Sequence, residues 1–201
     1  MTVTGTVPAP SSRALRVVAW IAFVLVALLI AAWFVAAKNP RLEGAGMSSQ
    51  SGEFELNDES DWMDADEAEW TVWDQPGGAW ASIVVKNARP YPVTLAPSDP
   101  TRFGEVQVAA FDPTSTASTM DAESVTPADS LRVEPGGYAL VSLRVTADCV
   151  ILSPGGAIGS DAAEVKVTTF GITSTLEVPF GAMYWAGWRG SHTPDADCPA
   201  S

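Results

Sequence analysis

Histidine and cysteine are the residues that this chain has least of. Its 201 residues include one histidine, His192, and two cysteines, Cys149 and Cys198. A Ser-His-Asp hydrolase needs a buried, oriented imidazole, whereas His192 stands in a polar C-terminal tail. Zinc and copper sites need two or more His or Cys ligands. We therefore expect no catalytic residue, no metal site and no cofactor, and we predict that the protein is not an enzyme.

The sequence also lacks a phosphate-binding loop. Its three Pro-Gly-Gly turns stand beside predicted strands and not before helices. Carboxylates that could form the pair of a glycoside hydrolase do occur in predicted loops. They are Asp112, Glu123 and Asp129. A glycan-active enzyme is therefore the least favoured of the alternative functions.

Positive charge is scarce, and the two signs are unevenly spread. Residues 1–41 carry four basic residues and no acidic one, whereas all 24 acidic residues and the other seven basic ones follow from Glu43 onward. A surface with this excess of carboxylates repels nucleic acid and anionic lipid headgroups. We expect no nucleic-acid partner, and an affinity for cations or basic proteins is favoured instead.

One long apolar run stands apart from this polar composition. Val17–Ala37 holds 21 residues without charge, Pro or Gly. As a helix it would span about 31 Å, which matches a hydrocarbon core of about 30 Å. We predict a transmembrane helix over 17–37 that anchors the protein in the plasma membrane, with 1–16 in the cytoplasm and the acidic remainder outside it. Small residues before Lys38 leave a cleaved signal peptide as the alternative.

Residues 38–69 are predicted to form a flexible acidic linker. Asn39–Gly52 is rich in Gly and Ser, and Glu53–Asp74 holds ten acidic residues and no basic one. The simplest interpretation is a solvated stalk that keeps the domain off the bilayer. The alternative is a partner-binding segment, because exposed indoles are enriched in interface hot spots. The candidate contact residues in this segment are Trp62, Asp64 and Asp66.

The same segment supports a different alternative, in which the protein binds calcium or another small ligand. An EF-hand needs acids at positions 1, 3 and 5, Gly at position 6 and Glu at position 12. No start within the segment satisfies that spacing, so only an irregular site is left open. Its oxygen ligands would be Asp58, Asp61, Asp64, Asp66 and Glu67.

From about Trp70 onward, apolar and polar residues alternate with a period of two. About seven short strands, separated by Pro and Gly turns, fit into this region without a soluble helix. We predict an all-β extracytoplasmic domain over 70–201, an immunoglobulin-like antiparallel β-sandwich preceded by one transmembrane helix. Ser82 and Ser142 are expected to face water, and 114–130 to form a loop that crosses between the sheets.

The two cysteines predict one disulfide, between Cys149 and Cys198, if the domain lies on an oxidising side of the membrane. Free thiols are the alternative. The bond would close a loop of about 50 residues, worth about 4 kcal/mol, and would hold the aromatic tail 184–198 on the sandwich. This tail either packs over the sandwich or binds a partner, a glycan or the membrane surface. Its candidate contact residues are Trp185 and Trp188.

Three runs carry a resemblance to a known group of proteins. They are IVVKNARPYPVTL (83–95), VEPGGYALVSLRVTADC (133–149) and VTTFGITSTLEVPF (167–180). A strand ending in Asn, a Pro-Val-Thr strand, a Pro-Gly turn before a long strand and an Asp-Cys after it resemble small single-pass envelope proteins of high-GC Gram-positive bacteria. The resemblance covers about residues 79–180. It implies an immunoglobulin-like or fibronectin-III-like domain and no catalytic residues.

These observations together predict a non-enzymatic, membrane-anchored interaction module with its folded domain outside the cytoplasm. Such a module would serve as an accessory subunit of a membrane complex or as an envelope scaffold. The expected partners are the membrane, through one helix, and a protein in or at the membrane.

Overall fold

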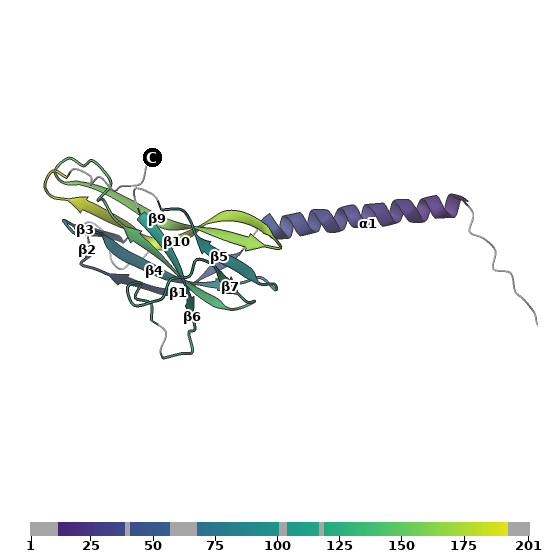
Figure 1. The fold of residues 1–201 in the computed structure, drawn as a ribbon, viewed down its shortest axis with the longest axis horizontal. Coiled ribbons are helices and arrows are strands. Elements are labelled where there is room, and N and C mark those ends of the chain that lie inside the picture. The colour runs from purple at the N-terminus through teal and green to yellow at the C-terminus, as the bar shows by residue number, and fades with distance from the viewer. Residues whose placement is uncertain (1–11, 39–40, 57–67, 101–103, 117–118, 193–201) are drawn as a thin grey trace, which may run out of the picture.

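The computed structural model describes residues 12–38, 41–56, 68–100, 104–116 and 119–192 (Figure 1). One helix, α1 (Ser12–Lys38), projects from a domain built of two β-sheets. The strands are β1 (Leu42–Ser51), β2 (Glu55–Leu56), β3 (Glu69–Trp73), β4 (Ala79–Asn87), β5 (Val93–Pro97), β6 (Gly104–Phe111), β7 (Leu131–Val133), β8 (Tyr138–Val145), β9 (Gly156–Thr169) and β10 (Ile172–Trp188). The predicted class, mostly β after one apolar helix, is confirmed. The predicted number of about seven strands is wrong, because the described residues alone form ten.

Helix α1 contains the predicted apolar run and extends it at both ends. The stretch Leu15–Lys38 is long and apolar enough to cross a membrane, and a signal sequence would have the same character. Its large apolar side chains are exposed over 40% to 70% of their surface. In contrast, Ala37 in the last turn is fully buried, at the contact between α1 and strands β9 and β10. The helix end is therefore packed against the sheet domain.

The region predicted to be a linker contains two of the additional strands. β1 pairs antiparallel with β4, with Leu42 opposite Asn87 and Ser51 opposite Trp80, and β2 pairs with β3. The linker prediction is therefore wrong for 42–51 and 55–56, and the sheet domain begins at Leu42 instead of residue 70. β1 lies at a sheet edge, where its backbone hydrogen bonds to β4 hold it, so it needs few apolar side chains.

The two sheets pack face to face. Sheet A has the order β1-β4-β8-β6 and is antiparallel throughout, and sheet B has the order β2-β3-β10-β9-β5-β7. Sheet B departs from the predicted antiparallel pattern at one pair, β3 and β10, which run parallel. The main core lies between the sheets and draws buried Val, Leu and Ala side chains from both. Its fully buried members include Val85, Val141, Leu95, Val165 and Val167.

The outer face of sheet A is covered as well. Val84, Ala109 and Leu140 form a second apolar cluster there, against side chains of the loop between β6 and β7. The hydroxyls of Ser82 and Ser142 lie 2.8 Å apart on this face, and the two residues are only 2% and 1% exposed. The prediction that these serines face water is therefore wrong. The loop does connect sheet A to sheet B as predicted, but it also covers the outer face of sheet A.

The C-terminal tail belongs partly to the sandwich itself. β10 continues to Trp188, so residues 184–188 of the predicted tail are strand residues that pair with β3 on one side and β9 on the other. β9 and β10 form a long hairpin whose turn, at Phe170 and Gly171, lies beside the end of α1 (Figure 1).

Candidate functional site

The candidate side chains of the described part of the chain gather at the two ends of the sandwich. The helix-proximal end, where α1 joins the domain, consists of the turns 87–92, 133–138 and 169–172. The helix-distal end, on the opposite side in Figure 1, consists of the loops 74–78 and 146–155 and the segment 189–192. The two ends differ in the chemistry that holds them together.

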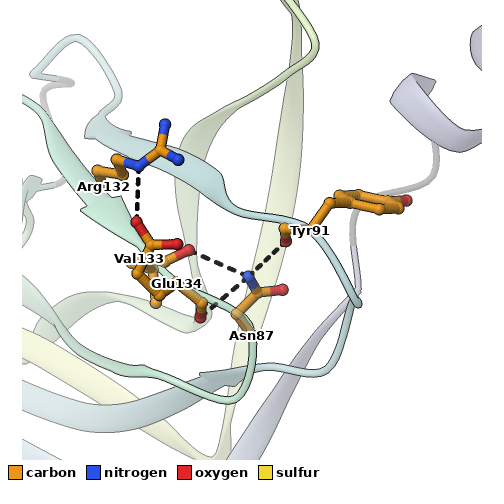
Figure 2. Close-up of polar contacts among 5 residues, drawn as sticks. All are labelled: Asn87, Tyr91, Arg132, Val133 and Glu134. Atoms are coloured by element: carbon orange, nitrogen blue, oxygen red, sulfur yellow. Dashed lines mark hydrogen bonds and ion pairs between the residues drawn. The ribbon is translucent and has the colours of Figure 1, made fainter.

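At the helix-proximal end, one buried amide joins two turns (Figure 2). Asn87 is fully buried, and its Nδ2 donates hydrogen bonds to the carbonyl oxygens of Tyr91 at 2.9 Å, Val133 at 3.1 Å and Glu134 at 3.3 Å. Its Oδ1 accepts a hydrogen bond from the backbone N–H of Arg89 at 3.0 Å. This side chain therefore joins the two turns through their backbone groups, and the Glu134 carbonyl also accepts a hydrogen bond from the N–H of Gly137 at 2.8 Å.

The same turn is connected to the helix. The Tyr91 hydroxyl donates a hydrogen bond to the carbonyl oxygen of Ala36 at 3.2 Å, in the last turn of α1. Carbonyls at a helix C-terminus have no partner within the helix, so an outside donor is favourable there. The Tyr91 ring also contacts the ring of Phe170, with centroids 4.7 Å apart. Asn87, Tyr91 and Ala36 thus link the sandwich to the helix through hydrogen bonds.

At the helix-distal end, a charged group of β2 meets charged groups of the residues that directly follow β3 and β10. The Arg189 guanidinium donates to both carboxylate oxygens of Glu55, at 2.9 and 2.8 Å, and lies 3.8 Å from the carboxylate of Asp74. It also lies over the indole of Trp73, 5.6 Å from its centroid. The side chains of Arg189, Glu55 and Asp74 are 41% to 59% exposed, so solvent weakens these attractions.

The single histidine is engaged at this end. The His192 ring stacks on Trp188, with centroids 4.2 Å apart and an interplanar angle of 1°. Its Nε2 lies 2.9 Å from the carbonyl oxygen of Asp148, whose carboxylate accepts a hydrogen bond from the backbone N–H of Gly77 at 2.6 Å. The imidazole therefore holds the loop 146–155 against the end of β10.

The two predicted contact residues of the tail lie on opposite faces of sheet B, as their spacing of three along a strand requires. Trp188 is half-buried and packs against the main core. Trp185 points outward and lies across Gly159, where an added Cβ would be 2.7 Å from the indole. The buried indole N–H of Trp185 has no acceptor among the described residues. The role of Trp185 and Trp188 as contact residues stays a prediction.

The other predicted contact residues, Trp62, Asp64 and Asp66, lie outside the described residues, as do the proposed calcium ligands. Within the described ranges no cluster of His, Cys, Asp and Glu could hold a metal ion. Cys149 is not a free thiol in the structure, whereas Cys198 lies in the part that is not described. The Cys149–Cys198 pairing stays a prediction.

Asp112, one of the loop carboxylates considered for a glycoside hydrolase, is hydrogen-bonded within its own turn. Asp112 accepts hydrogen bonds from the hydroxyl of Thr114 at 2.7 Å and from its backbone N–H at 2.9 Å. These bonds hold the pKa of the Asp112 carboxyl below its ordinary value. A general acid needs the opposite, a raised pKa.

Sequence reasoning missed the residues that distinguish the two ends. Asn87 was visible only as the last residue of a strand. Phe170 and Ile151 carried no signal, because their exposure follows from the tertiary arrangement: they are the two large apolar side chains of the described sheet domain that stay exposed, at 47% and 81%. Phe170 lies at the helix-proximal end and Ile151 at the helix-distal end.

No protein-family model matches the chain, and no curated protein matches it. Among solved structures, the chain is similar to the crystal structure of the CsuC–CsuE chaperone–tip adhesion subunit pre-assembly complex from archaic chaperone-usher Csu pili of Acinetobacter baumannii. The identity is 8% and the TM-score is 0.27, and the match covers 69% of this chain and 58% of that one. The chain thus spans less than two thirds of that structure, and so distant a likeness carries no argument about fold or function.

Proposed function

We propose that the protein is a non-enzymatic, single-pass membrane protein that presents an extracytoplasmic β-sandwich to a protein partner. α1 would span the plasma membrane with the N-terminus in the cytoplasm. The helix-distal end would then face away from the bilayer and carry the partner-binding surface. The protein would act as an accessory subunit of a membrane complex or as an envelope scaffold.

The observation that carries this proposal is the direct junction between α1 and the sandwich. The hydrogen bond from Tyr91 to Ala36 and the burial of Ala37 fix the sandwich at the end of the helix. A domain held in this way presents one end to a partner at a fixed distance from the membrane. The basic residues flank the apolar run evenly, with Arg13 and Arg16 before it and Lys38 and Arg41 after it, so the acidic remainder and its two cysteines support the orientation instead.

We also assign the sandwich to the immunoglobulin-like class, and the strand order supports this. β1-β4-β8-β6 corresponds to the strands A, B, E and D of that fold, and β10-β9-β5 corresponds to G, F and C. The predicted disulfide between Cys149 and Cys198 belongs to the same proposal. It would join the loop 146–155 to the C-terminal segment, next to the contact between His192 and Asp148.

The proposed binding surface combines apolar and acidic groups. Ile151 is 81% exposed at the helix-distal end, and the carboxylates of Glu55 and Asp74 lie at the same end. A partner with an apolar residue flanked by basic ones would complement this surface. Trp185 and the segment with Trp62, Asp64 and Asp66 are further contacts in the proposal.

The test is an affinity purification of the full chain from its native membrane in mild detergent, with crosslinking and mass spectrometry. We expect one protein partner in a fixed ratio to the chain. Ile151→Asp should abolish its recovery, because the substitution places a charge in the apolar part of the surface. Thr175→Asp, at an exposed position of β10 outside the helix-distal end, is the matched control and should leave recovery unchanged.

Two results would contradict the proposal. One is recovery of the chain alone from membranes in which it is abundant. The other is equal loss of the partner in Ile151→Asp and Thr175→Asp, because the helix-distal end would then have no special role.

A further inference from the structure

Phe170 is an unusual residue for the turn that it occupies. Its φ is 51°, in the left-handed region, which Gly, Asn and Asp adopt more readily than an aromatic residue does. Its side chain is 47% exposed, so the turn does not gain the full benefit of burying a ring. In a hairpin turn exposed to water, a small polar residue would adopt this backbone conformation at a lower cost in free energy. Its ring contact with Tyr91 still leaves about half of Phe170 exposed, so burying the remaining surface would stabilise this turn.

The position of Phe170 relative to the helix indicates what would bury that surface. The Phe170 ring packs on Tyr91, and the Tyr91 hydroxyl is bonded to Ala36 in the last turn of α1. Leu15–Lys38 is a stretch of 24 residues, which at about 1.5 Å per residue is about 36 Å long. A hydrocarbon core is about 30 Å thick, so the last turn of such a helix lies in the headgroup layer. Phe170 lies beside that turn.

We infer that the tip of the β9–β10 hairpin, with Phe170 and Tyr91, inserts into the interfacial layer of the bilayer that α1 spans. This inference rests on the membrane-spanning role of α1 in the proposed function. It adds a second, non-helical contact between the sandwich and lipid. Aromatic rings favour the membrane–water interface, where an apolar ring can be buried while a hydroxyl stays hydrated or bonded.

The charged groups at this end are compatible with a lipid surface. Lys38 and Arg41 are exposed beside the helix end, where their cationic groups can reach phosphate oxygens. The nearby carboxylate of Glu134 is paired with Arg132 at 2.7 Å. The helix-proximal end thus offers cations to the headgroups although the domain as a whole is strongly acidic.

Lipid photo-crosslinking tests this inference on the full chain. The protein is reconstituted into vesicles of phosphatidylcholine and phosphatidylglycerol, with benzoylphenylalanine placed at Phe170, Ile151 or Leu25 in separate preparations. Leu25, in the middle of α1, is the positive control, and Ile151 is the matched exposed apolar position at the other end. After irradiation, mass spectrometry should find phospholipid adducts at 25 and 170, with at least a tenfold lower yield at 151.

The inference is overturned if position 170 gives no more lipid adduct than position 151 while position 25 gives a strong one. A thermal melt of each preparation shows that the sandwich is folded, and Phe170→Asn, which suits the left-handed turn, should melt within a few degrees of the native chain. Alkaline carbonate extraction separates the two proposals. A chain that resists extraction but gives no adduct at 170 contradicts only the hairpin contact, whereas a chain that is extracted contradicts the membrane anchor itself.

Discussion

The two ends of the sandwich are stabilised by different interactions. At the helix-proximal end, the buried amide of Asn87 bonds four backbone groups, and no charge is involved. At the helix-distal end, the contacts of Arg189 are ion pairs and a cation–π contact between exposed groups. Buried hydrogen bonds cannot be exchanged for bonds to water, whereas exposed ion pairs can. The helix-proximal end is therefore expected to be rigid, and the side chains of the helix-distal end are expected to adapt to a partner.

The largest expected effect is that of Asn87→Ala. The substitution removes the side-chain donor of the buried Val133 carbonyl and of the partly buried Tyr91 carbonyl, and a buried group left unpaired costs about 1–3 kcal/mol. We expect the free energy of unfolding of the full chain in detergent to fall by about 3 kcal/mol or more, as measured by urea denaturation. Ser142→Ala, which breaks one buried hydroxyl pair, is the control and should cost about 1 kcal/mol. Equal losses of unfolding free energy in the two variants would contradict the conclusion that Asn87 is the main stabilising residue of the helix-proximal end.

A smaller effect is expected for Tyr91→Phe. It removes the hydrogen bond to Ala36 and keeps the ring against Phe170, so the free energy of unfolding should fall by about 1 kcal/mol. Amide hydrogen exchange should become faster in the turn 87–92 and unchanged at the helix-distal end. Faster exchange at both ends would mean that the two ends unfold together, which contradicts their independent stabilisation.

The fold was predictable where side chains alone determine an element. The uncharged run of α1 predicted a helix, and the alternation of apolar and polar residues predicted strands from about Trp70 onward. β1 was missed because its Gly- and Ser-rich sequence is held by backbone bonds to β4, and such bonds leave no pattern in the side chains. The burial of Ser82 was missed for a related reason, since the loop that covers it is polar in composition and contributes only a few apolar side chains, such as Met120.

The candidate site was harder to predict than the fold. Arg189 and Glu55 are 134 positions apart, and only the strand order brings them together. Similarly, the exposure of Phe170 depends on where the hairpin turn lies relative to α1. The spacing of Trp185 and Trp188 did contain usable information, because an interval of three along a strand already places them on opposite faces.

Arg189→Ala tests the other side of the comparison and should have a smaller effect still. Its side-chain contacts are exposed, and the hydrogen bond from the backbone N–H of Arg189 to Oδ1 of Asp74 at 2.9 Å is kept, so we expect a loss of less than about 1 kcal/mol. The loss should shrink further between about 0.05 M and about 1 M salt, because salt screens exposed charges. Arg189→Lys keeps the positive charge but loses the planar guanidinium over Trp73, so its loss of stability should be smaller than that of Arg189→Ala. A loss above about 2 kcal/mol that does not depend on salt would show that this end is as rigid as the other.

The smallest effect at neutral pH is expected for Tyr184→Phe, in the core near the helix-distal end. Tyr184 is 3% exposed, and burial raises the pKa of its hydroxyl above the ordinary value of 10.0, although a hydrogen bond from Gln50 opposes the shift. A raised pKa means that the folded chain keeps its proton where the unfolded chain has lost it. The free energy of unfolding of the native chain should therefore fall as the pH rises above about 10. Below that pH the hydroxyl is protonated in both states, so its ionisation does not change the free energy of unfolding. Tyr184→Phe should melt close to the native chain at pH 7 and show a shallower loss of melting temperature above pH 10. If the melting temperatures of the two proteins fall in parallel above pH 10, water reaches the Tyr184 hydroxyl in the folded state. The core near the helix-distal end would then be as accessible to solvent as the exposed ion pairs of Arg189.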